Sequence, residues 1–340
     1  MRAVVISEFG PPGVLKVTDI DIPQPGPREI LIQVQAAGVA RADLLQRQGK
    51  YAPPSGASDI PGLDVAGIVE TVGTGVTKFV AGDRVCAILT GGGYAEFCTA
   101  PQEQVLPTPD NWTSLEAATL PENLFTVYDN VVTRAALSAR ETILIHGGSS
   151  GIGTMAVRLA TLFEAKIIVT AGSDAKCQAC RRLGAHHAIN YRTSGDFAED
   201  VLDITNGKGV DVILDMVGGA YLARNLTSLA TEGRLVIIAT QGGHTATLDI
   251  VQLMKKRARV MGSTMRTRSV SEKGEIAQQL ASHIWPGLPA RTGIYPVIDS
   301  VFPLREAAAA HSRMESGESI GKIVLKMGDA DAQRDSGVMI

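Results

Sequence analysis

The fold is decided by the segment His146-Gly147-Gly148-Ser149-Ser150-Gly151-Ile152-Gly153. A short apolar strand is expected before it, at 142–146, and an amphipathic helix after it, at 152–163. At such a turn the backbone N–H groups and the positive end of the helix dipole face an anion, and small residues let a diphosphate approach closely. The turn therefore predicts a dinucleotide site, the alternative being a glycine-rich loop without a ligand. The residues expected against the pyrophosphate are Gly148, Ser149, Gly151, Ile152 and Gly153.

Strands and helices alternate on the C-terminal side of this turn. Further strands are expected at 166–170, 187–190, 210–215, 234–239 and 258–262. Six strands with helical crossovers predict an α/β fold, with a Rossmann-type doubly wound parallel sheet over residues 124–266.

The flanking segments have a different texture. Residues 1–123 alternate short β-branched runs with Gly and Pro turns, which is typical of a β-rich, barrel-like domain. Residues 267–327 hold one expected helix near 274–283 and a last strand at 322–325. Because this segment is too small to fold alone, we expect it to complete the first domain. Residues 328–340 are polar and aperiodic and are predicted to be a disordered tail.

Composition narrows the possible partners. A chain of 340 residues is longer than the roughly 250–300 residues that one hydrophobic core accommodates, so we expect two domains. No apolar run approaches the roughly 20 residues of a membrane helix. The net charge of −3 comes without a basic cluster of the kind that binds nucleic acid. Four cysteines are too few for a disulfide framework, and the first residues lack a signal-peptide pattern. We therefore expect a cytoplasmic protein that binds neither membranes nor nucleic acid.

A second enzyme class shares the glycine spacing. Gly147, Gly151 and Gly153 also fit the Gly-x-x-x-Gly-x-Gly turn of short-chain dehydrogenases, which use a Tyr-x-x-x-Lys pair for proton transfer. None of the six tyrosines is followed by lysine four residues later, so the sequence excludes this class.

The end of the second strand bears on the choice of cofactor. An NAD enzyme usually places Asp or Glu there to bind the ribose 2′-OH, but this chain reads Thr170-Ala171-Gly172-Ser173. Asp174 lies beyond the strand and is interpreted as a first-turn residue after an N-cap Ser173. Lys176 in that turn is unfavourable unless an anion binds there, and Tyr191 after the third strand could donate to the same 2′-phosphate. Either residue alone could be an ordinary surface or half-buried side chain. Together with Gly172 and Ser173 they predict NADPH.

The sequence predicts no metal site. The six histidines have no ligand-pair spacing with the cysteines. Cys177-Gln178-Ala179-Cys180 has zinc-knuckle spacing, but it lies on an expected helix without a second pair, which favours two packed or solvent-facing thiols.

Several further segments carry a likeness to a known family. They are Arg41-Ala42-Asp43-Leu44, Gln48-Gly49-Lys50-Tyr51, Pro61-Gly62-Leu63-Asp64-Val65-Ala66-Gly67, Val72-Gly73, Gly82-Asp83-Arg84-Val85, Gly92-Gly93-Tyr94-Ala95-Glu96 and Ile320-Gly321-Lys322-Ile323-Val324. With the glycine-rich turn, they resemble the medium-chain dehydrogenase/reductase superfamily and, within it, the zinc-free quinone oxidoreductases that include zeta-crystallin. The resemblance covers residues 1–327 and is nearest to the p53-inducible quinone oxidoreductases, through 41–51 and 53–58.

The resemblance implies a GroES-like fold for the first domain and NADPH-dependent reduction of a quinone without metal. Zinc enzymes of the superfamily carry Cys where this chain has Ala40, and His-Glu where it has Leu63-Asp64. The likeness also implies that Thr126 packs beside the nicotinamide. Gln241, Gly242 and Met265 are implied to line the same end.

Two positions depart from the family pattern. Members often have Asn where this chain has Ala40, near the substrate, so no amide is present there to orient it. Arg158 stands where many members have Gln, which we expect to be a tolerated change on a helix surface.

Three functions stay open. In the first, NADPH reduces a quinone held between the β-rich domain and the nicotinamide, in one-electron or two-electron steps. Tyr51 is then the one polar candidate for orienting the carbonyl, or else an aromatic wall. In the second, the substrate is an activated alkene such as an enal or enone. In the third, favoured only by Ala40, the chain binds NADPH without catalysis. The strand at 258–262, at the expected sheet edge, predicts a homodimer.

Overall fold

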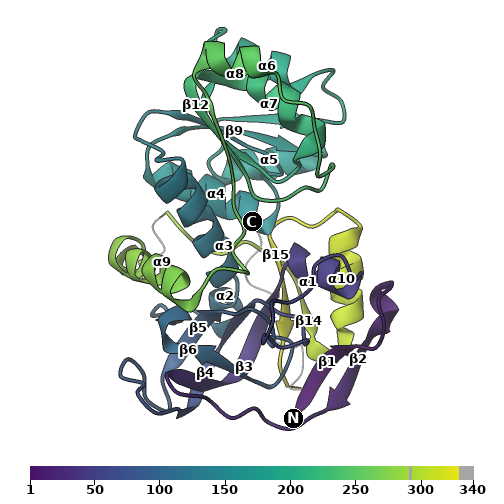
Figure 1. Ribbon diagram of the computed structural model, residues 1–340, viewed down its shortest axis with the longest axis vertical. Coiled ribbons are helices and arrows are strands. Elements are labelled where there is room, and N and C mark those ends of the chain that lie inside the picture. The colour runs from purple at the N-terminus through teal and green to yellow at the C-terminus, as the bar shows by residue number, and fades with distance from the viewer. Residues whose placement is uncertain (291–292, 329–340) are drawn as a thin grey trace. The chain divides into compact units, whose positions relative to one another are not determined.

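The computed structural model describes residues 1–290 and 293–328, which form two compact units (Figure 1). One unit comprises Met1–Phe125 and the described residues from Met265 onward, except Gly293–Tyr295. The other comprises Thr126–Thr264 and Gly293–Tyr295. Apart from Gly328, the tail expected at 328–340 lies outside the described residues. No helix within the described ranges is long and apolar enough to cross a membrane.

The first unit is built on a seven-stranded sheet, beside a separate hairpin of β1 and β2. The order is β14-β15-β3-β4-β5-β7, and β6 also pairs with β3. Side chains alternate along a strand, so Ile30, Ile32 and Val34 of β3 enter the same buried core as Val65 and Val85. The strands are β1 Arg2–Ile6, β2 Leu15–Asp19, β3 Glu29–Val39, β4 Asp64–Val72, β5 Arg84–Ile88, β6 Phe97–Pro101, β7 Val105–Pro107, β14 Ile298–Pro303 and β15 Lys322–Lys326.

The C-terminal segment contributes two strands to this sheet. β15 pairs antiparallel with β3, with Ile323 opposite Val39, and β14 pairs parallel with β15. The sequence analysis predicted neither β14 nor the helix α10. For α10 the reason is that the residues Ala307–Ala310 favour a helix but show no apolar periodicity. The helices of the unit are α1 Arg41–Arg47, α2 Ser114–Ala117, α9 Val270–His283 and α10 Ala307–Glu315. Short 3-10 turns are η1 Pro12–Val14, η2 Gln102–Gln104, η5 Trp285–Gly287 and η6 Leu304–Glu306.

The second unit is a six-stranded sheet in the order β10-β9-β8-β11-β12-β13, and every pairing is parallel. The predicted doubly wound sheet is therefore confirmed. The strands are β8 Thr142–Ile145, β9 Lys166–Ala171, β10 His187–Asn190, β11 Val210–Asp215, β12 Leu229–Ile237 and β13 Arg259–Gly262. The helices are α4 Gly151–Leu162, α5 Asp174–Leu183, α6 Phe197–Ile204, α7 Leu222–Ser228 and α8 Ile250–Lys256, with the 3-10 turn η4 Gly219–Tyr221. A further helix, α3 Pro121–Val127, begins in the first unit and ends in the second, where the π-helix η3 Tyr128–Arg134 continues it.

Both faces of this parallel sheet are covered. Leu144 and Ile168 pack with Phe197 of α6 in one buried cluster. Their neighbours Ile143 and Ile167, which point to the other face, are also fully buried. A strand buried on both faces needs apolar residues in succession, which is why the central strands β8 and β9 contain the unbroken apolar runs 143–145 and 167–169.

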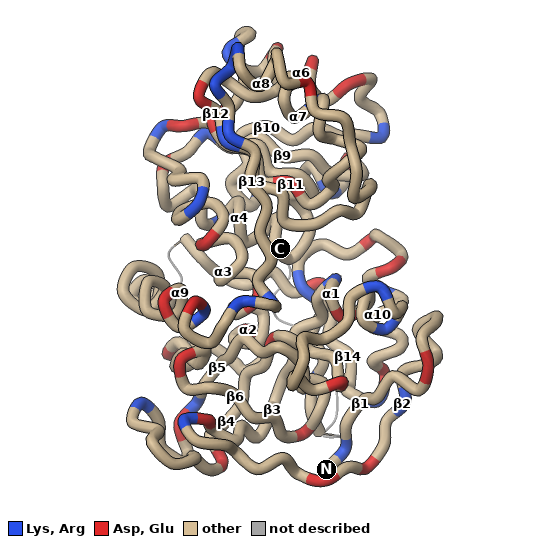
Figure 2. The backbone as a smooth tube through the Cα atoms, in the orientation of Figure 1, with Lys and Arg blue, Asp and Glu red and all other residues tan. Residues whose placement is uncertain are grey.

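The strand order reverses at β8, which lies between β9 and β11. In an open parallel sheet, ligands bind beyond the carboxyl ends of the strands at such a switch point. The glycine-rich turn directly follows β8, so the topology places it there. Basic and acidic residues are interspersed along the two units (Figure 2). Because neither sign dominates, binding of an anion at the end of β8 depends on the groups in its immediate surroundings.

Candidate functional site

The glycine-rich turn is held by close packing of backbone and small residues. Ser150 is the N-cap of α4, and its hydroxyl accepts a hydrogen bond from the Gly153 N–H at 2.9 Å. A Cβ on Gly153 would lie 2.2 Å from the Gly147 carbonyl oxygen, and one on Gly148 would lie 2.6 Å from Cβ of Val169. The turn therefore requires glycine at both positions, because no side chain fits between its two arms.

The first turn of α4 leaves donors for a ligand. The Gly148 N–H donates to the Thr170 carbonyl at 2.9 Å. The N–H groups of Gly151 and Ile152 donate to none of the described residues. Orphan N–H groups at a helix start bind oxyanions, helped by the helix dipole. This arrangement fits a diphosphate.

A buried polar network lies under the turn. His146 Nε2 is 2.7 Å from Asn225 Oδ1 and its Nδ1 is 3.0 Å from Thr170 Oγ1. Asn225 Nδ2 donates to Asp215 at 3.1 Å, so Asn225 Oδ1 faces His146 and the histidine Nε2–H donates to it. Burial lowers the pKa of His146 to about 4, which keeps the ring neutral in this role at pH 7.

Asp215 shapes the next loop from the end of β11. Its carboxylate accepts hydrogen bonds from the N–H groups of Val217 at 2.7 Å and Gly218 at 3.1 Å. Burial raises the pKa of Asp215 to about 6, although these donors oppose the change. The network thus ties β8, β9 and β11 together where their carboxyl ends meet. The sequence analysis did not identify it, because its members are spread over 80 residues.

Basic and hydroxyl-bearing side chains gather at the end of β9, around Gly172, and we call this region the basic corner. Ser173 caps α5 and accepts from the Lys176 N–H at 3.3 Å, as predicted, and Lys176 lies in the first turn. β10 runs parallel to β9 with Asn190 opposite Ala171, so the chain after β10 passes beside Gly172. A Cβ on Gly172 would lie 2.7 Å from the Tyr191 hydroxyl. Gly172, Ser173 and Tyr191 are thus brought together.

Arg192 belongs to the same corner and was missed from the sequence. Its Nε would lie 3.5 Å from a Cβ on Gly172. A basic residue directly after Tyr191 was the available signal. Asp174, the one acid nearby in sequence, accepts a hydrogen bond from Asn190 Nδ2 at 2.8 Å. A hydroxyl and an arginine therefore stand where an NAD enzyme would place a carboxylate.

Three more predicted residues lie in the second unit. Gln241 and Gly242 follow β12, and their N–H groups donate to the carbonyls of Met216 and Val217 at 3.3 and 2.7 Å. Their loop thus pairs with the loop after β11, at the same sheet edge as the turn. Thr126 has a buried Oγ1 without a hydrogen-bond partner, which leaves that hydroxyl for a ligand.

The other two predicted residues lie in the first unit. Met265 begins its second segment, so its place beside the nicotinamide stays a prediction. Tyr51 is half buried, and the guanidinium carbon of Arg266 lies 5.5 Å from the centre of its ring. Burial raises the pKa of the Tyr51 phenol, while the charge of Arg266 acts in the opposite direction.

The positions that match zinc ligands of the superfamily hold other groups. Ala40 precedes α1 and has no donor atom in its side chain. The carboxylate of Asp64 forms an ion pair of 2.6 Å with the ammonium of Lys322. Within residues 1–290 and 293–328 no three His, Cys, Asp or Glu side chains form a group that could hold a metal.

All four cysteines are buried free thiols. Burial raises the pKa of Cys98 and Cys180 to about 12, so both stay protonated at neutral pH. Cys177 and Cys180 lie on α5, so of the two alternatives left open they are packed thiols.

The expected surface position of Arg158 is wrong. Its side chain is buried rather than at the helix surface, because the segment Gly293–Tyr295 covers this face of α4. The guanidinium carbon lies 3.5 Å from the centre of the Tyr295 ring. Burial lowers the pKa of Arg158 to about 10, and its Nε and Nη2 have no partner.

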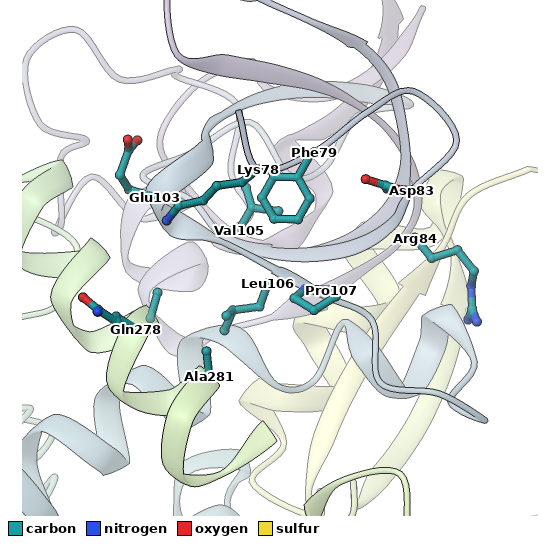
Figure 3. A pocket seen from close by; sticks show the side chains of 11 residues that line it. Lys78, Phe79, Asp83, Arg84, Glu103, Val105, Leu106, Pro107, Gln278 and Ala281 are labelled. Atoms are coloured by element: carbon teal, nitrogen blue, oxygen red, sulfur yellow. The ribbon is translucent and has the colours of Figure 1, made fainter. Parts of the chain in front are cut away.

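A pocket of about 600 Å³ lies on the first unit, between the segment 78–84, β7 and α9 (Figure 3). Phe79, Leu106 and Ala281 line it, with polar side chains at its rim. Of these, Glu103 is paired with Arg28. The pocket contains none of the predicted site residues and no unpartnered buried polar atom, so it does not carry the chemistry of the site.

Comparisons with known proteins agree with this arrangement. Residues 26–110 match the family described as alcohol dehydrogenase GroES-like domain, and residues 151–282 match the family described as zinc-binding dehydrogenase. The chain is 35% identical to the quinone oxidoreductase of Lama guanicoe over 96% of this chain and 97% of that one. It is 33% identical to the human quinone oxidoreductase with the same coverage.

Comparison with solved structures also indicates a dinucleotide-binding oxidoreductase. A mycobacterial protein complexed with NADPH superposes with a TM-score of 0.86 at 30% identity, covering 96% of this chain and all of the other. The fold and the site define a two-domain oxidoreductase with a GroES-like domain and a Rossmann-type dinucleotide-binding domain. The chain belongs to the quinone oxidoreductase family of the medium-chain dehydrogenase/reductase superfamily.

Proposed function

We propose that this protein is an NADPH-dependent quinone reductase that works without a metal. The observation that carries the choice of NADPH is the corner at Gly172, where Tyr191 and Arg192 approach and no carboxylate ends β9. The relatives named quinone oxidoreductase, and the solved neighbour complexed with NADPH, support the same cofactor and substrate class.

The residues divide the work of holding the cofactor. The free N–H groups of Gly151 and Ile152 bind the pyrophosphate, in the turn formed by Gly148, Ser149 and Gly153. Lys176, Tyr191 and Arg192, with the Ser173 cap, bind the 2′-phosphate. Thr126, Gln241, Gly242 and Met265 border the nicotinamide, and Tyr51 orients the substrate carbonyl. NADPH, when bound, supplies the reducing equivalents, and the protein supplies position.

The reaction is tested by following NADPH oxidation with phenanthrenequinone and, separately, with a series of alkenals. We expect the quinone to be reduced faster. Activity on alkenals alone would replace the quinone by an activated alkene as substrate. If NADPH raises the melting temperature while no acceptor is reduced, the protein is a non-enzymatic NADPH binder.

The choice of cofactor has its own test in the basic corner. Replacing Lys176 or Arg192 by alanine removes one charged hydrogen bond to the 2′-phosphate. We expect the Kd for NADPH to rise about 10–100-fold in each variant, since such a bond contributes about 1.5–3 kcal/mol, while the Kd for NADH stays unchanged. Titration calorimetry with both nucleotides measures this.

Arg182→Ala is the matched control for these two variants, because Arg182 is an exposed residue at the other end of α5. It should leave both Kd values unchanged. Equal losses for NADPH and NADH in the Lys176 and Arg192 variants would contradict the assignment of the 2′-phosphate site.

A homodimer and cytoplasmic residence are also proposed. β13 is an edge strand that pairs only with β12 among the described strands, and its Val260 is partly exposed. The neighbouring helix α8 exposes Ile250, Val251 and Met254, each by more than half. An open strand edge beside an apolar helix face favours pairing with a second copy. Light scattering after gel filtration should give twice the chain mass, and a monomer would dispose of the dimer.

A further inference from the structure

Arg266 is a buried arginine of the first unit that is fixed at two of its three nitrogens. The residue is 4% exposed. Nε donates to the Thr90 carbonyl at 2.8 Å, and Nη2 donates to Gln46 Oε1 at 2.7 Å. Gln46 is itself held, because its Nε2 donates to the Asp59 carbonyl at 2.8 Å. The guanidinium therefore has one defined position.

The third nitrogen, Nη1, is buried and has no hydrogen-bond partner. No carboxylate among the described residues forms an ion pair with Arg266. The nearby Asp43 is occupied, because it accepts from the N–H groups of Ala40 and Gly62 and from the Tyr94 hydroxyl. The charge of Asp43 therefore stabilises the guanidinium only from a distance, without accepting a hydrogen bond from Nη1. A buried N–H donor without an acceptor is costly, so this unused donor points to a ligand.

Tyr51 covers the guanidinium of Arg266. Its ring lies over the guanidinium at 5.5 Å, and the residue is only half buried. A rotation of the Tyr51 side chain alters this contact without disturbing the hydrogen bonds that hold Arg266. The same rotation carries the phenol hydroxyl, so both groups are able to contact one ligand.

We propose that Arg266 binds the substrate oxygen, with Nη1 donating to the carbonyl of a quinone or other conjugated cyclic ketone after Tyr51 moves aside. This rests on the proposed reductase function. The oxygen gains negative charge as the ring is reduced, and a preorganised donor stabilises that charge. The overall reaction balances as quinone + NADPH + H⁺ → hydroquinone + NADP⁺, in which NADPH would supply a hydride and solvent would supply one proton. Arg266 keeps its own proton throughout.

The kinetic test compares Arg266→Gln and Arg266→Lys with the wild type. We expect kcat/KM for phenanthrenequinone to fall about 10²–10³-fold in R266Q, as for the loss of one oxyanion donor, and less in R266K. The Kd for NADPH should not change. Guanidinium added to R266A should restore part of kcat, which a merely structural arginine would not allow. Wild-type kinetics in a folded R266Q protein would overturn the inference.

Arg158→Gln is the matched control for these variants. Arg158 is also buried with unpartnered nitrogens, but it lies on α4 and packs against Tyr295. This variant should keep the kcat/KM of the wild type. A comparable loss in R158Q would assign the effect to the removal of any buried arginine and overturn the inference.

A second test uses binding alone and needs no turnover. The probe is 4-nitrophenol, a ring-sized acid whose absorbance reports its ionisation. An opposite charge within about 4–6 Å lowers the pKa of an acid by about 1–3, so wild-type protein should lower the apparent pKa of the bound probe by about 1 or more. R266Q should bind it without that change.

The two tests separate the inference from the proposed function. If the wild type reduces the quinone but leaves the probe's pKa unaltered, the inference fails and the function stands. If the wild type lowers the probe's pKa but reduces neither quinones nor alkenals, Arg266 is an anion donor and the proposed reaction is wrong. Because the probe measurement uses the wild type, it decides the matter even if R266Q does not fold.

Discussion

Replacing Gly153 by alanine is expected to weaken NADPH binding about 10–100-fold and to destabilise the second unit. The added Cβ would lie 2.2 Å from the Gly147 carbonyl oxygen and 2.7 Å from the Gly148 backbone. These are backbone atoms, so no flexible side chain is able to give way. The start of α4 must shift, which costs about 1–3 kcal/mol of stability as overpacking. The loss of affinity has a separate source, because misplacing one charge-assisted hydrogen bond to the diphosphate costs about 1.5–3 kcal/mol, or roughly 10–100-fold in Kd.

The loss of affinity has a definite structural cause. The N–H groups of Gly151 and Ile152 are the free donors of the turn, and they move with the start of α4. The N-cap Ser150 also fixes the shape of this turn, because its hydroxyl accepts a hydrogen bond from the Gly153 N–H. A shift of α4 therefore misplaces both the donors and the cap that fixes them.

Titration calorimetry with NADPH and thermal unfolding measure the two effects. Gly195→Ala is the matched control, because a Cβ on Gly195 meets nothing within 4 Å and its backbone is not in the left-handed region. It should keep the wild-type Kd and melting temperature. Wild-type affinity in G153A would show that the cofactor does not depend on this turn.

The backbone features of the proposed cofactor site could be predicted because they are local in sequence. The turn, the N-cap Ser173 and the end of β9 each follow from residue types within a few positions of a strand. Backbone geometry decides these features, and glycine, serine and strand periodicity report it directly. The strand order then brings Tyr191 to Gly172, because parallel neighbours align their carboxyl ends.

The features that the sequence could not predict depend on side chains that meet across long separations. Arg158 is buried because the chain returns to α4 at Gly293–Tyr295, which no local pattern around residue 158 reveals. Arg266 is fixed by Gln46 and Thr90, far away along the chain. A charged residue read in isolation is most often exposed, so only the three-dimensional structure identifies these two as buried.

The second large effect is expected from Lys322, which joins two carboxylates inside the first unit. Its ammonium lies 2.6 Å from Asp64 and 3.2 Å from Glu122, and Asp64 is fully buried. Burial disfavours the charged amine, but the two carboxylates outweigh it and raise the pKa of Lys322 above its ordinary value. The lysine is therefore charged at neutral pH and compensates Asp64.

Lys322→Met should lower the free energy of unfolding by about 3–5 kcal/mol at pH 7, because it leaves the charge of Asp64 buried and unpaired. Urea unfolding measures the loss. Lys326→Met is the matched control, since Lys326 is a partly exposed lysine at the other end of β15. If K322M were as stable as K326M, the ion pair would not matter for folding.

Two further measurements separate the charge from the packing. Adding Asp64→Asn to K322M should restore part of the lost stability, because it removes the unpaired charge and keeps an oxygen that accepts from the Glu122 N–H. Lowering the pH should act in the same direction. In K322M the folded state favours a protonated Asp64 carboxyl, so the folded protein binds more protons than the unfolded chain, and stability falls as the pH rises. A loss that stays constant from acid to neutral pH would mean that lost packing, and not an unpaired carboxylate, destabilises the variant.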